Sequence, residues 1–178
     1  ILSIDADERV SDALKQEIIE ILKKASALDI YSIPRMSWYC GKFMRHSGWY
    51  PDYVIRLFKR NHGKFSDDLV HERLIVSPQS THGHLKSELI HYSFRDFSQV
   101  LKKVDTYSSA AAAQAFKKGK RSSIGRAVLK GLWTFFRTYF LRLGFLDGSL
   151  GLALAISNAE GTYYRHLKIW LMSEDEND

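Results

Sequence analysis

Apolar and polar positions divide the chain into a strand-rich first half and a helical second half. Residues 1–4 form a short apolar run that ends in acidic residues, which predicts a buried parallel strand with a site at its carboxyl end. Ser11 is a favourable helix cap, and apolar side chains recur with helical spacing up to about Ala25. The first predicted elements are therefore a strand, a loop and a helix.

From Asp29 to Ser93 the pattern changes to short β-prone segments separated by proline, glycine and asparagine. Residues 53–60 alternate as a strand does, and residues 89–92 predict another strand. These segments predict an α/β unit with a mixed sheet over residues 1–93.

Three helices are predicted after Ser93, and together they make a helical region over residues 94–178. The first extends from Phe97 to about Ala115 and ends at Gly119; the second covers residues 123–143. The third follows Asp147, which we expect to cap it, while Gly144 ends the helix before it.

Charge is distributed unevenly in this basic chain, which carries a formal net charge of +6. No Asp or Glu occurs between Thr106 and Leu146, where eight Lys and Arg residues fall. Such a stretch predicts attraction to anionic partners. The single Cys40 excludes a disulfide framework and favours a cytoplasmic setting.

Residues 131–146 combine many aromatic side chains with spaced arginines, a composition typical of a helix at a membrane interface. The same composition also fits a core helix. Because the acid-free basic stretch would face anionic headgroups, we expect residues 126–170 to dock on a membrane surface. We expect no spanning helix, since Arg137, Arg142 and Asp147 interrupt the apolar run.

Asp5-Ala6-Asp7 places two carboxylates at the end of the predicted first strand. A divalent cation prefers oxygen ligands, and such a cation neutralises a nucleotide diphosphate, so this pair is a candidate metal site. An exposed acidic loop is the alternative interpretation.

Further candidates lie downstream. Glu72, in Val70-His71-Glu72, is a candidate general base, with Asp67 and Asp68 as competitors. His91 lies in an apolar strand, where it is either a third metal or phosphate ligand or a hydrogen-bonded core histidine.

Basic and aromatic residues supply candidates for substrate contact. Arg56 and the cluster Lys117–Arg121 are candidates for phosphate binding, although lysines on a helix are more often solvated. Candidates for stacking on sugar rings, or for ordinary packing, are Trp38, Tyr39, Trp49 and Tyr50.

Several short motifs occur in an order that resembles a known family. They are residues 2–10, Pro34-Arg35 to Gly41, Gly48 to Asp52 with Arg56, Val70 to Glu72, Ile90 to Ser93, Tyr107 to Ala111, and Gly144 to Gly148. Together they resemble the family 2, WaaE-type glycosyltransferases of lipopolysaccharide-core synthesis.

This resemblance implies a GT-A fold and an inverting, metal-dependent transfer of a sugar from a nucleotide-sugar donor to a lipid-linked saccharide acceptor. It implies that Asp5 and Asp7 bind Mg²⁺ or Mn²⁺, with His91 completing the site, and that Glu72 is the base. Arg35 and Tyr107, which lie in the matching motifs, join Arg56 and Trp38 as substrate-binding candidates. At the family level the donor sugar is glucose, and the location is the cytoplasmic face of the inner membrane.

The chain opens on an apolar segment without an initiating Met, so we expect coding sequence before Ile1 that holds most of the nucleotide pocket. We therefore expect this portion alone to be inactive. The alternative function is a non-enzymatic basic module that binds membrane or nucleic-acid phosphates, although it leaves the ordered acidic motifs unexplained, and we expect no nucleic-acid partner.

Overall fold

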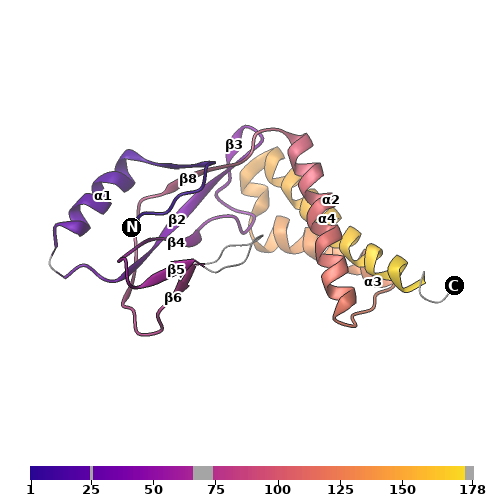
Figure 1. Cartoon of the computed structure of the whole chain (residues 1–178). Coiled ribbons are helices and arrows are strands. Elements are labelled where there is room, and N and C mark those ends of the chain that lie inside the picture. Colours follow the sequence, from indigo (N-terminus) through magenta and orange to yellow (C-terminus); the bar gives the residue numbers. More distant parts are fainter. Residues whose placement is uncertain (25, 66–73, 175–178) are drawn as a thin grey trace. The chain divides into compact units, whose positions relative to one another are not determined.

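The computed structural model describes residues 1–24, 26–65 and 74–174, and its contacts divide the chain into two compact units (Figure 1). The first unit holds Ile1–Trp38 and Trp49–Ser93, and the second holds Tyr39–Gly48 and Phe94–Asp178. The polypeptide therefore passes between the two units three times.

β2 (Ile30–Tyr39) is the central strand of the first unit. It pairs antiparallel with β4 (Asp52–Phe58), parallel with β7 (His82–His84), and also borders β8 (Leu89–Phe94). β8 pairs antiparallel with β1 (Glu8–Val10). Because parallel and antiparallel pairs occur in one sheet beside a helix, the predicted α/β class is confirmed.

A separate two-stranded antiparallel sheet joins β5 (Gly63–Phe65) to β6 (Leu74–Val76). The strands predicted at residues 53–60 and 89–92 correspond to β4 and β8, each within two residues at either end.

Helix α1 (Asp12–Leu22) packs its apolar face on the sheet of the first unit. The Ser11 hydroxyl accepts a hydrogen bond from the backbone nitrogen of Leu14 at 3.2 Å, which confirms the predicted cap. Leu14 and Ile18 are buried together with Ile33 of β2. This cluster is the core that fixes β2 and the strands beside it.

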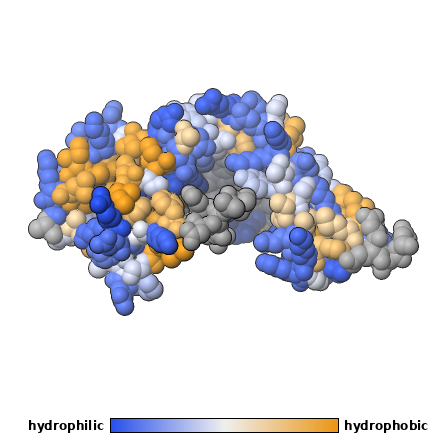
Figure 2. All heavy atoms as spheres, in the orientation of Figure 1, coloured by the Kyte–Doolittle hydropathy of each residue, from blue (hydrophilic) through white to orange (hydrophobic). Residues whose placement is uncertain are grey.

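The buried parallel strand expected at residues 1–4 is wrong. Leu2 makes a single antiparallel bridge to Leu57 of β4, and the apolar side chains of Ile1 and Ile4 are about half exposed. A buried parallel strand needs neighbours on both edges, whereas this segment borders only β4 within the described residues. Figure 2 shows apolar side chains gathered over the visible face of this unit.

The second unit is built from three helices, α2 (Phe97–Lys117), α3 (Ile124–Phe136) and α4 (Gly148–Glu174), and from a short strand β3 (Lys42–Phe43). α4 packs against both α2 and α3. Gly119 has a φ of +74°, a left-handed conformation that glycine adopts readily, and α2 ends just before it. The predicted helical region after Ser93 is confirmed.

The helix predicted over residues 123–143 is present from Ile124 to Leu141, and its last part has π-helical geometry. After α3 the chain forms a π-helical turn, η1 (Arg137–Leu141), and then a 3-10 turn, η2 (Gly144–Asp147). Gly144 begins η2 and does not end the preceding helix, which stops at Leu141. An added Cβ at Gly144 would lie 2.8 Å from the carbonyl oxygen of Thr138, so the two turns pack too closely for a larger residue.

Asp147 does not act as the expected cap of α4. Its buried carboxylate accepts hydrogen bonds from the backbone nitrogens of Arg45 and His46 at 3.2 and 2.9 Å. The Lys42 ammonium donates to its carbonyl oxygen at 3.0 Å. Asp147 therefore fastens the segment after β3 to the helices of the same unit.

Within the described residues, no single helix is long and apolar enough to cross a membrane. By length and composition alone, Ile124–Leu141 and Gly144–Glu174 meet that criterion together, as a pair bent by 70°.

Candidate functional site

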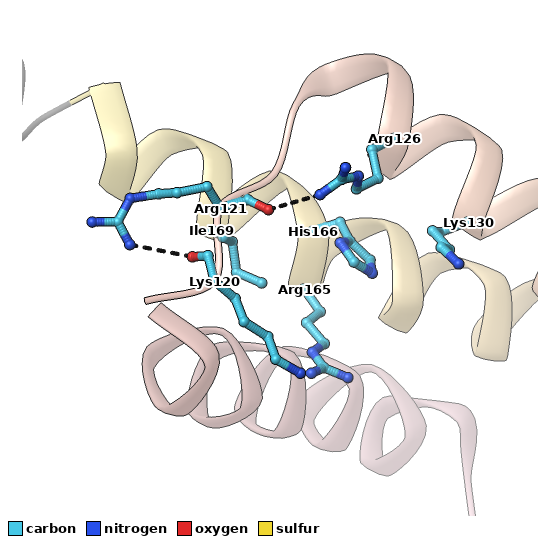
Figure 3. Close-up of a pocket in the computed structure, with 7 residues that line it drawn as sticks. All are labelled: Lys120, Arg121, Arg126, Lys130, Arg165, His166 and Ile169. Atoms are coloured by element: carbon cyan, nitrogen blue, oxygen red, sulfur yellow. Dashed lines mark hydrogen bonds between the residues drawn. The ribbon is translucent and has the colours of Figure 1, made fainter. Parts of the chain in front are cut away.

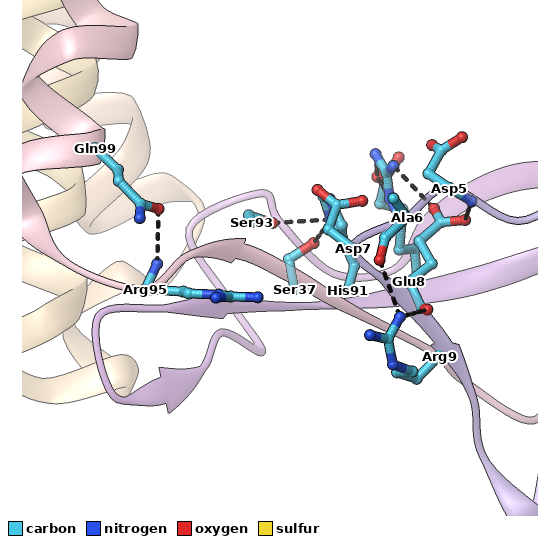
Figure 4. Close-up of polar contacts among 12 residues, drawn as sticks. Asp5, Ala6, Asp7, Glu8, Arg9, Ser37, His91, Ser93, Arg95 and Gln99 are labelled. Carbon is cyan, nitrogen blue, oxygen red and sulfur yellow. Dashed lines mark hydrogen bonds and ion pairs between the residues drawn. The ribbon is translucent and has the colours of Figure 1, made fainter.

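Asp7 and His91 come together in the first unit (Figure 4). Asp7 lies in the turn before β1, and His91 lies on β8, the strand that pairs with β1. The Nε2 atom of His91 is 3.3 Å from the Asp7 Oδ2 atom. The backbone nitrogen of Tyr92 donates to the carbonyl oxygen of Asp7 at 2.9 Å, which holds the turn against β8.

The other ring nitrogen of His91, Nδ1, lies 3.0 Å from the Ser37 hydroxyl and 2.8 Å from the Ser93 hydroxyl. A proton on Nε2 can be donated to Asp7, while a proton on Nδ1 can be donated to either hydroxyl and would leave the lone pair of Nε2 free for a cation shared with Asp7. Burial lowers the pKa of His91, and the positive charge of Arg35 lowers it further. The imidazole is therefore neutral at pH 7, the form that binds metals.

Glu8 is the residue that links the rest of the cluster. Its side chain is fully buried and accepts a hydrogen bond from the Nη2 atom of Arg56 at 2.8 Å. The same carboxylate accepts from the backbone nitrogen of Asp5 at 3.0 Å, and the Arg35 Nη1 atom lies 3.5 Å away. Glu8 thus fixes the Asp-x-Asp turn to β2 and β4.

The two arginines each hold a second carboxylate. Arg56 forms an ion pair with Asp5, and Arg35 binds Asp52 through Nε at 2.9 Å and Nη2 at 2.6 Å. Both guanidinium groups are mostly buried. We expected them to contact substrate, whereas in this structure their partners are carboxylates of the protein.

The cluster carries a small excess of negative charge. Its four carboxylates, on Asp5, Asp7, Glu8 and Asp52, outnumber by one the guanidinium groups of Arg35, Arg56 and Arg9, and His91 is neutral. The side chains of Asp5 and Asp7 are 55% and 49% exposed, so the uncompensated charge faces solvent. This arrangement attracts cations, as a site for a divalent metal requires.

The fit to a metal ion is partial. Asp7 and His91 are close enough to be ligands of one cation, but the carboxylate of Asp5 is turned to Arg56. Among the described residues, no group of three acidic, histidine or cysteine side chains is arranged to hold a metal. Mg²⁺ is commonly bound by one or two protein carboxylates plus substrate phosphates, and a two-residue protein site is consistent with that pattern.

Two other predicted substrate contacts have partners outside the acidic residues. Trp38, at the end of β2, packs beside Tyr92 with ring centroids 6.1 Å apart. Tyr107 belongs to α2 of the second unit, where the Lys103 ammonium lies 5.6 Å from its ring centre. The base candidates Glu72, Asp67 and Asp68 lie outside the described residues.

Sequence reasoning missed Glu8, although it directly follows the Asp-x-Asp motif. A third acidic residue was a visible signal, but its burial depends on arginines 27 and 48 positions later in the chain. Arg165 and His166 were missed as well, and they line a basic pocket in the second unit.

Comparison with curated proteins finds similarity along almost the whole chain. It is 26% identical over 178 residues to the lipopolysaccharide core biosynthesis glycosyltransferase LpsC of Rhizobium meliloti, covering 92% of this chain and 63% of that protein. It is 27% identical to the uncharacterized glycosyltransferase RT0209 of Rickettsia typhi and 26% identical to RP128 of Rickettsia prowazekii, covering 95% of this chain and 61% of each.

The chain thus spans about three fifths of the length of the curated relatives it matches. No family model matches the chain, and no solved structure matches it. The resemblance to glycosyltransferases of lipopolysaccharide-core synthesis, first seen in the motifs, is confirmed by these relatives.

Proposed function

We propose that this chain is part of an inverting glycosyltransferase that moves a sugar from a nucleotide-diphosphate donor to a lipopolysaccharide-core or similar glycan acceptor. The observation that carries the proposal is the acidic cluster around Asp7 and His91, in a chain similar over 92% of its length to a lipopolysaccharide-core enzyme. The proposed fold is GT-A, supported by the mixed sheet with an Asp-x-Asp turn at its edge.

The proposed reaction forms a bond between the acceptor oxygen and the anomeric carbon of the sugar. The bond from that carbon to the diphosphate oxygen breaks on the opposite face, and the diphosphate leaves with the electron pair. A base takes the proton of the acceptor hydroxyl, and Glu72 is our candidate for that role. The family resemblance supports this assignment.

Asp7 and His91 are the proposed metal ligands. Asp5 becomes a third ligand if its carboxylate leaves Arg56 and binds the cation. A bound Mg²⁺ or Mn²⁺ would neutralise charge on the departing diphosphate. The protein's own contribution is positional, because Glu8 holds the backbone of Asp5 and β8 holds the backbone of Asp7. Asp7 is thus fixed at its main chain while its carboxylate stays half exposed.

We further propose that the enzyme works as a peripheral protein on the cytoplasmic face of a bacterial inner membrane, where it meets a lipid-linked acceptor. Support comes from α3, whose side chains Leu129, Leu132 and Trp133 are 69%, 62% and 53% exposed. Arg126 and Lys130 lie beside this apolar face on the same helix.

Asp7→Asn tests the metal assignment in the full-length protein that the gene encodes. Calorimetric titration with UDP-glucose, with and without Mn²⁺, should show that the variant loses metal-dependent donor binding. Asp12→Asn is the matched control, because Asp12 is an exposed carboxylate in the first turn of α1. Unchanged donor binding and turnover in Asp7→Asn would contradict the assignment.

The base assignment has its own test. Glu72→Gln should lower turnover by roughly two to four orders of magnitude while donor affinity stays nearly unchanged, because a base acts in transfer and contributes little to donor binding. Asp68→Asn should have a much smaller effect. If Asp68→Asn were the crippling change, the base would move to Asp68.

A further inference from the structure

A pocket of about 420 Å³ in the second unit is lined almost entirely by basic side chains. They come from three segments, the loop after α2, α3 and α4, and they are Lys120, Arg121, Arg126, Lys130, Arg165 and His166 (Figure 3). Among the residues that the structure describes, no carboxylate lines the pocket. Its volume falls within the range of about 300–1,000 Å³ usual for small-molecule sites.

The pocket holds like charges close together. Figure 3 shows Lys120, in the loop after α2, and Arg165, on α4, pointing toward one another. The Nε atom of Arg165 is buried and has no hydrogen-bond partner within the described residues. Buried polar atoms are normally paired, so this donor is available to a ligand.

Contacts within the protein keep the pocket in shape. The Arg126 guanidinium donates to the carbonyl oxygen of Arg121 at 3.0 Å, and the Ser122 hydroxyl lies 3.2 Å from the Nδ1 atom of His166. Burial lowers the pKa of His166, and the charges of Arg165, Lys130 and Arg126 lower it further. Burial and these neighbouring charges together disfavour a proton on His166.

The position of the pocket favours a lipid as the source of the anion. Arg126 and Lys130 each lie three residues before an exposed apolar side chain of α3, Leu129 and Trp133, and residues three apart are neighbours on a helix. A phosphate in the pocket would therefore lie beside an apolar surface that can accept acyl chains.

We propose that this pocket binds the phosphomonoester group of a membrane lipid, with the exposed face of α3 resting in the adjoining acyl region. A phosphomonoester carries more negative charge than a phosphodiester and offers three terminal oxygens, which suits several convergent cations. The proposal deepens the proposed membrane attachment and rests on it. It does not require sugar transfer, because it is tested by binding alone.

The test uses vesicles of phosphatidylcholine containing a minor fraction of phosphatidic acid, compared with vesicles in which phosphatidylglycerol supplies the same charge. The chain should prefer phosphatidic acid. Lys120→Gln/Arg165→Gln should weaken that binding by roughly ten- to thirty-fold, since each cation near an anionic surface contributes enough for about a three- to fivefold effect.

Lys117→Gln/Lys118→Gln is the matched control, because it removes the same charge from exposed residues that do not line the pocket. It should weaken binding by less than about threefold. Equal losses in the two variants, or equal binding to the two lipids, would overturn the proposal in favour of diffuse attraction. If circular dichroism shows that Lys120→Gln/Arg165→Gln is unfolded, Arg126→Gln/Lys130→Gln replaces it as the pocket variant. Its loss of vesicle binding is then compared with that of the control.

Two further measurements identify the source of the phosphate. Leu129→Ser/Leu132→Ser should lose vesicle binding and keep affinity for glycerol phosphate. Tryptophan emission should shift to the blue on vesicles only, and Trp133→Phe should reduce that shift, since the chain has three other tryptophans. Binding of glycerol phosphate as tight as vesicle binding would overturn the lipid assignment. A pocket variant that loses affinity for a single-stranded oligonucleotide and keeps vesicle binding would overturn it as well.

Discussion

Replacing Glu8 by glutamine should destabilise the first unit more than the same substitution at an exposed glutamate does. The Glu8 carboxylate is fully buried, 2.8 Å from one guanidinium and 3.5 Å from another. Glutamine keeps the size of the side chain, but it removes the negative charge and turns one acceptor into a donor that faces arginine donors. Both arginines then lose a buried partner.

The magnitude follows from the burial of the pair. Removing one partner of a buried ion pair costs about 3–5 kcal/mol. Because Arg56 keeps Asp5 and Arg35 keeps Asp52, we expect the lower end, about 3 kcal/mol. For a chain of this size that loss lowers the melting temperature by about 6–12 °C.

Urea unfolding followed by circular dichroism measures the change, with the slope m expected to stay constant. Glu20→Gln removes an equal charge from an exposed position of α1 and should change the free energy of unfolding by less than about 0.5 kcal/mol. A loss below about 1 kcal/mol in Glu8→Gln would refute the reasoning, because the carboxylate would then be no better paired than an ordinary surface group.

Three further predictions, made with four substitutions, concern the second unit. Gly151→Ala should destabilise it by about 1–3 kcal/mol or more in thermal melts, because the added Cβ would overlap the Gly144 carbonyl; Gly161→Ala, whose nearest neighbour would be 3.8 Å away, should instead stabilise it by about 0.5–1 kcal/mol. Equal effects would contradict this packing. Asp147→Asn should cost about 1–3 kcal/mol in urea unfolding, since fewer acceptors remain for buried donors; a loss no larger than that of Glu20→Gln would be inconsistent with its role. The pKa of His166 lies below its ordinary value, so the unfolded chain binds more protons and stability falls as the pH drops below about 6.5. His166→Gln should flatten that fall in melts between about pH 7 and 5.5, and parallel curves for variant and wild type would argue against it.

Elements with a local signal were predictable from sequence. The cap at Ser11 and the helical spacing of the apolar residues after it located α1. Gly119 located the end of α2. Both signals depend on only a few neighbouring residues. The alternation of side chains over residues 53–60 located β4 in the same way. The similarity to glycosyltransferases was also readable, since it rests on ordered motifs.

Features that depend on distant partners were not predictable. Apolar spacing predicted the helix that ends at Leu141, but it gave no signal for the π-helical geometry from Arg137 or for the 3-10 turn that follows. Glu8 reads as one more acid in an exposed loop until folding brings Arg35 and Arg56 to it. The basic pocket likewise joins Lys120 to Arg165, which are separated by most of two helices.

The hydrogen bonds that Asp147 receives from Arg45 and His46 bear on how parts of this architecture can be exchanged between relatives. The donors are encoded between two strands of the first unit, so a gene segment beginning at Phe94 would specify helices whose buried carboxylate lacks those donors. The loop at residues 45–46 and the helices are therefore structurally interdependent, so a change at one of them bears on the stability of the other. Chimaeras between relatives should accordingly exchange residues 39–48 along with residues 94–174 if they are to retain this arrangement.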